Sequence, residues 1–579
     1  MKKYLILTVL LASVYAFALP AANELSTREL VGQTIMPRVV IGHHHVFKEP
    51  LEKGEITGFF VKAAEGLTVH PVITRKNQDK FLAKQRKKLI QTIRDLNTWA
   101  SKNPRQIPLL LGFDYEGGTV TSPMFMGLKQ MPSNMLLAAT QDPLLISQMY
   151  AQQAAEIKRV GGNMALGPDA DVNSNPANPI IQTRSFGDNA SQVGRYAAAA
   201  VEGLQTHGVP SCVKHYPGHG DTATDSHYSQ PVTDVSEKEL WDTHISSFIP
   251  AIEKGVWGVM TNHVVYPQVD AENSAIFSHK IIQNILRDKI GFNGLVMTDG
   301  LDMGGTNGKP IRDIVLDGFA AGNDVLLLTG GTTEIKASAQ YPGQAATWVE
   351  EDLHQTHPRV DKDALVKSVQ RVLDLKQFLA HPSDETSDET EFARTSRRVA
   401  EKGVTLVRDT QNFPLSLQNA SNVCVVMFAD GIFSNQVYAF VDVLKQQGKK
   451  VKYVQTPRTP SADADKNISS CMHKAEAVIV GTSATSSLQP EQFEKVVALL
   501  QQAQLRRIPA ALVSLLNPYE IPSYPQAKTV VALYGPTSDT TTVAAEILSG
   551  LRAAQGVLPI TLPENIFLPF EKIKRATIL

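Results

Sequence analysis

The chain has 579 residues, of which 43% are hydrophobic and 20% are charged. This composition is typical of a globular protein and excludes long disorder or a fibrous repeat. The 56 basic and 57 acidic residues leave a net charge of −1, so nucleic acid or an anionic membrane is not predicted as the main partner. Because the length exceeds what one modest core needs, we expect two domains.

The first residues predict a secretory signal peptide over residues 1–18. Lys2 and Lys3 precede the apolar run Tyr4–Ala18, which ends in the small-x-small pattern Ala16-Phe17-Ala18. The alternative is an uncleaved anchor helix, for which the run is short. The sequence predicts no integral membrane span after cleavage. We therefore expect an exported protein that works in the periplasm or outside the cell.

Residues 19–380 alternate short apolar runs with helical patterns. The expected strands are Thr57–Val61, Ile107–Phe113, Gly162–Leu166, Ser211–Lys214, Trp257–Thr261, Gly294–Thr298 and Asp324–Leu328. The expected helices include Lys80–Trp99, Leu144–Arg159, Asn189–Thr206 and His279–Asp288. Strands that alternate with helices indicate βα units around a parallel sheet. A segment of this length favours a TIM-like (β/α)8 barrel over an open sheet.

A linker is predicted over residues 381–394, since the run from His381 to Glu391 repeats Ser-Asp-Glu-Thr and contains no apolar residue after Pro382. Residues 395–579 again alternate strands and helices, which predicts a smaller α/β domain. Its expected strands are Val423–Phe428, Val451–Tyr453, Ala477–Val480, Ala510–Ser514 and Val530–Leu533. Its expected helices are Phe433–Gln447, Pro490–Gln502 and Thr540–Ser549.

The three cysteines do not form a disulfide framework. Cys424 and Cys471 could pair in an oxidising compartment. Cys424 lies in an apolar run, however, and this position favours a buried free thiol. Cys212 is expected to be a small core residue.

The segment with the richest chemistry is Lys214-His-Tyr-Pro-Gly-His-Gly-Asp-Thr-Ala-Thr-Asp-Ser-His227, which directly follows a predicted strand. Barrel enzymes place their active sites at the carboxyl ends of strands, so a plain surface turn is disfavoured. One hypothesis is a metal site built from His215, His219, Asp221 and His227. The other is acid/base catalysis, in which Asp225 orients His227 and His227 donates a proton.

Other strand ends carry further candidates. Asp299 follows an apolar strand and could attack an electrophilic carbon, or could simply cap a helix. Asp114 stands in a Gly-rich turn and could accept hydrogen bonds from substrate hydroxyls. Arg184 lies in a long polar loop and could clamp a substrate or tether the loop. His263 could be structural or could contact substrate.

These motifs resemble the signature of glycoside hydrolase family 3, in its β-N-acetylglucosaminidase branch. The signature is Lys214-His-Tyr-Pro-Gly-His-Gly220 followed by Asp225-Ser-His227. Supporting matches in the family's order are Phe113–Gly118, Asp171–Pro176, Arg184–Gly187, His263–Pro267 and Thr298-Asp299. The resemblance covers about residues 25–380. It extends more weakly through Gly403–Arg408, Phe413–Leu415 and Gly556–Leu562, where it resembles the α/β sandwich of two-domain members.

The resemblance implies a retaining exo-enzyme that removes terminal β-linked N-acetylglucosamine, without metal or organic cofactor, from an amino-sugar glycan such as a peptidoglycan fragment or a chito-oligosaccharide. It places Asp299 at the position of the nucleophile and His227 at that of the acid/base residue, with Asp225 as its dyad partner. It also assigns substrate binding to a further set of side chains: Asp114, Arg184, Lys214, His215 and His263.

Three alternatives stay open. A β-glucosidase-type exo-glycosidase of the same fold would generally take its acid/base carboxylate from the second domain and would lack the Asp-x-His pair. A phosphorylase would exploit a histidine that is neutral after proton donation and repels phosphate less than a carboxylate does. A glycan-binding barrel without catalysis is disfavoured because Asp225, His227 and Asp299 are all present. Thr119 and Gly300 depart from the family's common residues and leave the finer sugar contacts open.

Overall fold

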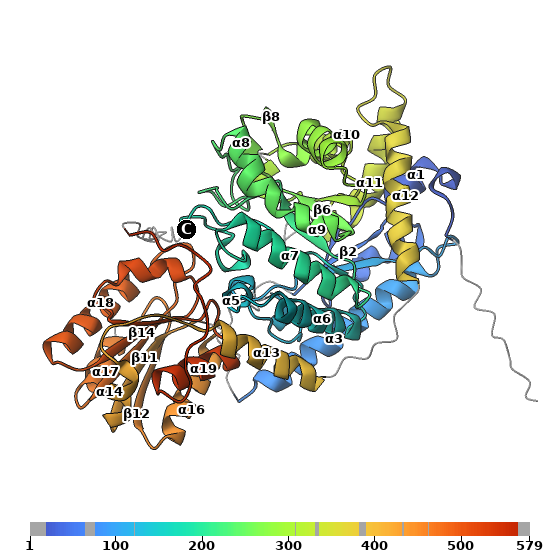
Figure 1. Ribbon diagram of the computed structural model, residues 1–579. Helices are drawn as coiled ribbons and strands as arrows, with labels where there is room; N and C mark the ends of the chain where they lie inside the picture. The colour runs from blue at the N-terminus through green and yellow to red at the C-terminus, as the bar shows by residue number, and fades with distance from the viewer. Residues whose placement is uncertain are drawn as a thin grey trace, which may run out of the picture.

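The computed structural model describes residues 19–63, 76–120, 122–306, 308–329, 335–380, 389–430, 433–460 and 463–564. The chain forms two lobes, which Figure 1 shows side by side: a barrel lobe up to residue 380 and a second lobe from residue 389 onward, drawn in orange and red. The predicted signal peptide over residues 1–18 lies outside the described residues. Residues 389–394, which the linker prediction included, belong to helix α13 (Glu389–Gly403).

The barrel lobe is built on parallel strands that pair in a closed ring. The first sheet has the order β1 (Arg38–Val40), β2 (Gly58–Lys62), β3 (Leu110–Phe113) and β4 (Met164–Ala165). The second has the order β5 (Cys212–Tyr216), β6 (Gly258–Thr261) and β9 (Leu295–Thr298). Parallel bridges join the ends of these sheets: Ala165 to Ser211, Met297 to Val325, and Leu326 to Ile35. This pairing is the one that a (β/α)8 barrel requires.

Helices cover the outside of the ring, and α3, α6 and α7 among them lie where the sequence predicts helices. The long ones are α3 (Gln78–Ala100), α6 (Pro143–Arg159), α7 (Ala190–Gln205), α10 (Ile311–Ala320), α11 (Ile335–Leu353) and α12 (Lys362–Leu379). The side chains of Asp142, Asn189 and Asp361 accept backbone N–H groups at the starts of α6, α7 and α12, which stabilises these helix ends. The helix expected near residue 280 is a π-helix, Lys280–Lys289.

Short elements complete the barrel lobe. They are α1 (Thr27–Gly32), α2 (Lys48–Glu52), α4 (Ser122–Phe125), α5 (Asn134–Ala139), α8 (Glu237–Glu239), α9 (Ile249–Glu253) and the antiparallel pair β7 (Val265–Tyr266) and β8 (Asp270–Ser274). The barrel interior is packed with apolar side chains that include Phe60, Leu110, Met164, Met260 and Met297. Cys212 belongs to this core as a buried free cysteine, as predicted.

The second lobe holds a six-stranded sheet with the order β10-β15-β14-β13-β11-β12, in which only the β10–β15 pair is antiparallel. Its strands are β10 (Thr405–Asp409), β11 (Asn422–Phe428), β12 (Lys450–Thr456), β13 (Ala477–Thr482), β14 (Ala510–Ser514) and β15 (Thr529–Ala532). Its helices are α14 (Phe413–Asn419), α15 (Phe433–Gln436), α16 (Tyr438–Gln446), α17 (Asp463–Met472), α18 (Pro490–Leu505) and α19 (Ser538–Leu548). The α/β class predicted for this lobe is confirmed.

A disulfide joins Cys424 of β11 to Cys471 of α17, with the two Cα atoms 5.3 Å apart. The free thiol favoured by the sequence is therefore wrong. An apolar run around Cys424 does fix its burial, but burial does not decide pairing. Helix α17, which the sequence did not predict, packs on β11 and β12 and brings Cys471 to its partner.

Removal of this disulfide is expected to lower the free energy of unfolding by about 2–4 kcal/mol, because it frees a closed loop in the unfolded chain. The change is Cys424→Ala with Cys471→Ala, and the measurement is chemical denaturation followed by circular dichroism. Reduction of the wild-type protein should give the same loss, whereas reduction of the double variant should change nothing. Coincident curves for reduced and untreated wild type would contradict the pairing.

The second lobe packs directly on the loops that follow β3 and β4. Gln130 Nε2 donates to the Pro536 carbonyl at 3.0 Å, and Tyr519 Oη donates to the Asn173 carbonyl at 3.4 Å. A Cβ atom added at Gly535 would lie only 3.1 Å from the Gly118 Cα atom, so the two backbones are in close contact. Within the described part of the chain, no helix has both the length and the apolar character that a bilayer crossing needs.

Candidate active site

A cavity of about 420 Å³ opens at the carboxyl ends of the barrel strands. Six of the predicted site residues line it: Asp114, Arg184, Lys214, His215, His227 and Asp299. They come from the ends of β3, β5 and β9 and from the loops that follow β4 and β5. The ring of parallel strands therefore brings together residues that are up to 185 positions apart in the sequence, since 299 − 114 = 185.

A buried ion-pair network forms one wall of the cavity. Lys214 Nζ lies 2.5 Å from Asp114 Oδ1 and 2.7 Å from Glu116 Oε1. Arg184 binds Glu116 through two nitrogens, at 2.8 and 3.1 Å. Burial opposes ionisation of Glu116, but the charges of Arg184 and Lys214 hold its pKa well below the usual range. The cations are thus fixed in place, and with Asp114 they offer donors and acceptors suited to sugar hydroxyls.

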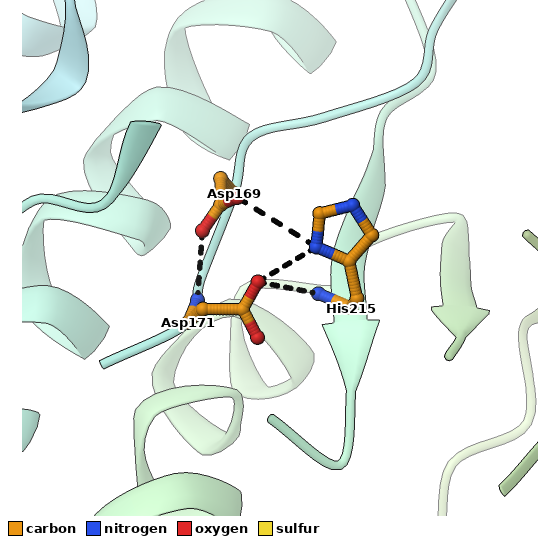
Figure 2. A group of neighbouring side chains, drawn as sticks. All are labelled: Asp169, Asp171 and His215. Carbon is orange, nitrogen blue, oxygen red and sulfur yellow. Dashed lines mark hydrogen bonds and ion pairs between the residues drawn. The ribbon is translucent and has the colours of Figure 1, made fainter. Parts of the chain in front are cut away.

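His215 is oriented from behind by two aspartates (Figure 2). Its Nδ1 lies 2.7 Å from Asp171 Oδ2, and its backbone N–H donates to the same oxygen at 3.2 Å. Asp169 Oδ1 accepts the backbone N–H of Asp171 at 3.0 Å. Since Nδ1 donates to a carboxylate, Nε2 is left as the acceptor for Arg184, at 3.1 Å. This pair of contacts fixes both the tautomer and the ring plane of His215.

The two aspartates differ in how readily they ionise because they lie so close together. Burial and the neighbouring charge of Asp171 raise the pKa of Asp169 well above its usual range. For Asp171, burial is outweighed by the contacts with His215 and the N–H of His219, and its pKa is lowered. Of the two carboxyl groups, Asp171 is therefore the one that ionises more readily, and it is the one that contacts the His215 ring.

The metal hypothesis finds no support in the positions of its four residues. Among the described residues, the group whose ligand atoms lie within 4.8 Å of one another is Asp169, Asp171 and His215. Of the four, only His215 belongs to it. Asp171 already accepts N–H groups from His215 and His219, and Arg184 lies 3.9 Å from Asp169. The donors of this group are thus engaged with one another and with a fixed cation.

The different contacts of the two aspartates lead to a paired prediction. Asp169→Asn is expected to keep kcat/KM within about threefold of wild type, because the Asn amide oxygen can still accept the Asp171 N–H and because Asp169, 3.7 Å from His215 Nδ1, makes no hydrogen bond to that ring. Asp171→Asn removes the acceptor for His215 Nδ1 and is expected to lower kcat/KM by about 10²-fold through misplacement of the ring. Steady-state kinetics and thermal unfolding of both variants check this. Equal losses in the two variants would contradict the view that only Asp171 holds the ring of His215.

The Asp225–His227 dyad is formed in the structure. Asp225 Oδ1 accepts the His227 backbone N–H at 2.9 Å and its Nδ1–H at 2.8 Å. Burial raises the pKa of Asp225, but the hydrogen bonds from His227 lower it further, so the carboxylate is ionised. Nδ1 is thereby occupied, and Nε2 is the nitrogen that can exchange a proton. His227 lines the cavity with half of its side chain exposed, whereas Asp225 lies behind it.

Hydrogen bonds hold the loop that carries the dyad at several points. The Gly304 N–H donates to the His227 carbonyl at 3.1 Å, and the Gly305 N–H donates to the Ser226 carbonyl at 3.0 Å. Inside the loop, His219 Nε2 lies 3.1 Å from Ser226 Oγ. Burial lowers the pKa of His219 to about 4, so this imidazole is neutral. His219 therefore supports the dyad loop.

Asp299 ends strand β9 and faces the cavity. Burial opposes its ionisation, but the nearby imidazoles of His215 and His263 and the N–H of Gly300, at 2.7 Å, lower its pKa to about 2. His263 is fully buried and lies behind the cavity wall, where its Nε2–H donates to the Gly300 carbonyl at 3.0 Å. The structure thus places His263 in support of the Asp299-Gly300 peptide, and its side chain does not line the space that a sugar could occupy.

Sequence reasoning missed several residues of this site. Asp169 and Asp171 follow the predicted strand Gly162–Leu166. Two acidic residues just beyond the end of an apolar strand were the sequence signal that could have identified them. Glu116 lies within the family-like segment Phe113–Gly118 but was not predicted as a site residue. Thr485 and Ser486, from the second lobe, also line the cavity, and no local pattern indicated them.

Comparison with known proteins agrees with this geometry. Residues 26–375 match the family model described as the glycosyl hydrolase family 3 N terminal domain. Beta-hexosaminidase A of Pseudoalteromonas piscicida is 27% identical over 531 residues, which are 82% of this chain and 86% of that protein. A Cellulomonas fimi protein named beta-N-acetylglucosaminidase/beta-glucosidase is 26% identical over 78% of this chain and 82% of its own length.

A solved structure gives the same result. The glycoside hydrolase family 3 beta-N-acetylglucosaminidase from Paenibacillus sp. str. FPU-7 matches with a TM-score of 0.78 and 26% identity, over 94% of this chain and all of that one. The family model spans more than half of the chain and contains every predicted site residue. The chain therefore belongs to glycosyl hydrolase family 3, and it is a glycoside hydrolase.

Proposed function

We propose that the protein is a retaining exo-β-N-acetylglucosaminidase. The observation that carries the proposal is the placement of an ionised Asp299 and the Asp225–His227 dyad on one cavity. Retaining hydrolysis needs a carboxylate that can attack the anomeric carbon and a proton donor for the leaving oxygen. The names of the relatives, beta-hexosaminidase and beta-N-acetylglucosaminidase, support the choice of sugar.

The mechanism has two displacements. Asp299 attacks the anomeric carbon while His227 Nε2–H protonates the leaving oxygen, and the bond from the anomeric carbon to that oxygen breaks. The sugar is then bound to Asp299 as an ester. His227, now neutral, takes a proton from water, whose oxygen attacks the anomeric carbon and releases Asp299. Asp225 stabilises the charged imidazole and holds its Nδ1–H throughout.

The experiment compares matched aryl β-glycosides, an N-acetylglucosaminide and a glucoside. We expect kcat/KM to favour the acetamido sugar by at least about tenfold, a difference of roughly 1.4 kcal/mol in transition-state binding. A preference for the glucoside would instead support the β-glucosidase alternative. The same reactions in phosphate buffer should release the free sugar. Release of a sugar 1-phosphate would mean that phosphate, and not water, accepts the glycosyl group.

We further propose that the enzyme is exported and acts on peptidoglycan fragments or chito-oligosaccharides. The amino-terminal pattern of basic and apolar residues supports export, and so does the Cys424–Cys471 disulfide, because such bonds persist in oxidising compartments. Cell fractionation followed by amino-terminal sequencing tests this. We expect the mature protein outside the cytoplasm with Leu19 as its first residue. A cytoplasmic protein that retains residues 1–18 would overturn it.

A further inference from the structure

The second lobe contributes directly to the catalytic cavity. Thr485 and Ser486 line it together with His227 and Asp299 of the barrel lobe. Both residues lie in the loop that follows strand β13, where the chain leaves the carboxyl end of the second-lobe sheet. Each presents a hydroxyl group and is half-buried. The cavity is thus incomplete without the second lobe.

Hydrogen bonds within the second lobe hold this loop in place. Asn517 Nδ2 donates to the Thr485 carbonyl at 2.6 Å, and an Arg458 nitrogen lies 3.4 Å from Thr485 Oγ1. Arg458 is itself held by Asp430, at 2.8 Å. Just before the loop, Ser483 Oγ donates to the Phe428 carbonyl at 2.7 Å. The hydroxyl of Thr485 is therefore positioned before any ligand arrives, which lowers the entropy lost on binding.

The position of the loop defines which part of a substrate it meets. The strand ends of the barrel form the floor of the cavity, and they carry Asp114, Lys214 and Asp299. The second lobe packs on the loops that follow β3 and β4. Since Thr485 and Ser486 line the cavity from that lobe, they lie beyond the strand ends, on the side of the mouth. An exo-acting enzyme takes the terminal sugar to the floor and leaves the rest of the substrate at the mouth.

We propose that Thr485 and Ser486 form part of the leaving-group subsite and that this subsite takes a second sugar ring. The assignment rests on the proposed exo-glycosidase function. The half-buried apolar side chains of Val120 and Ile180 line the same cavity. A pyranose has apolar ring faces and a hydroxylated rim, and this mixture of hydroxyls and aliphatic carbon matches it. A flat aryl group would leave the hydroxyls without partners.

The test is the double variant Thr485→Val with Ser486→Ala, which removes both hydroxyls and keeps the size of the side chains. Its kcat/KM is measured with N,N′-diacetylchitobiose, whose leaving group is a sugar, and with an aryl N-acetylglucosaminide, whose leaving group is not. We expect about a tenfold loss on the disaccharide, as for two lost hydrogen bonds, and less than a twofold change on the aryl substrate. Thermal unfolding verifies that the variant is folded.

The matched control is Ser487→Ala, the next residue of the same loop, which does not line the cavity. It should leave both substrates unaffected. Equal losses on the two substrates would mean that the hydroxyls contact the terminal sugar, and no loss on either would mean that they bind neither ring; both results overturn the subsite. If the wild-type enzyme cleaves neither N-acetylglucosaminide, the proposed function itself fails and the subsite with it.

Discussion

Replacement of Asp299 by Asn is expected to lower kcat by about 10⁴-fold or more, the loss typical for removal of a nucleophile. The side chain keeps its shape and its contact with the Gly300 N–H, so the fold should be unchanged. What the variant lacks is the negative charge that a pKa of about 2 guarantees at neutral pH. Turnover of an aryl N-acetylglucosaminide by purified protein, together with thermal unfolding, measures both effects.

A nearby carboxyl group gives the control. Asp302 also lines the cavity, but burial raises its pKa and its neighbours are Thr329 and Arg38. Asp302→Asn is therefore expected to cost far less, about tenfold at most, because it removes no reacting group. A purified Asp299→Asn variant that keeps a tenth of wild-type turnover would reject Asp299 as the nucleophile, and a larger loss in the Asp302 variant would move the role to that residue.

The second large effect is expected for His227→Ala, and it should depend on the leaving group. With a poor leaving group, such as the hydroxyl oxygen of a second sugar, loss of the proton donor should lower kcat/KM by about 10²–10⁴-fold. With a dinitrophenyl leaving group, which departs without protonation, the loss should be less than about tenfold. A series of aryl N-acetylglucosaminides with graded leaving-group pKa values measures this difference as a slope.

Asp225→Asn should give an intermediate result. The Asn side chain can still contact His227 Nδ1, but it no longer stabilises the charged imidazole. We therefore expect a slope between those of wild type and His227→Ala. If His227→Ala lowered kcat/KM equally for good and poor leaving groups, the role of His227 would be in substrate binding and not in proton donation to the leaving oxygen.

Much of the barrel lobe could be predicted because its strands are short apolar runs that alternate with helical patterns. Strands β2, β4, β5, β6 and β9 begin and end within two residues of the expected strands, whereas β3 begins three residues later than expected. Strand β1 was missed because it has three residues and begins with Arg38. Helix α17 was missed because its buried face, Ala464, Ile468, Cys471 and Met472, is interrupted by polar residues. Because Cys471 lies on this helix, its position next to Cys424 could not be predicted either.

Only those parts of the site whose residues lie close together in the sequence could be predicted. The Asp225–His227 pair is local, two residues apart, and its hydrogen bond follows from that spacing. The support for His215 is not local, since Asp171 precedes it by 44 residues and reaches it only when β4 and β5 lie side by side. The contribution of Thr485 depends on how two lobes pack, which no periodicity in one segment encodes.

The most direct test of the central claim is the configuration of the first sugar released. Proton NMR of a reaction with an aryl β-N-acetylglucosaminide, recorded before mutarotation, identifies the anomer. A double displacement through Asp299 with His227 as acid and base predicts the β-anomer of N-acetylglucosamine. First release of the α-anomer would show a single displacement by water and contradict the role of Asp299, and the absence of any released sugar from folded protein would contradict the activity.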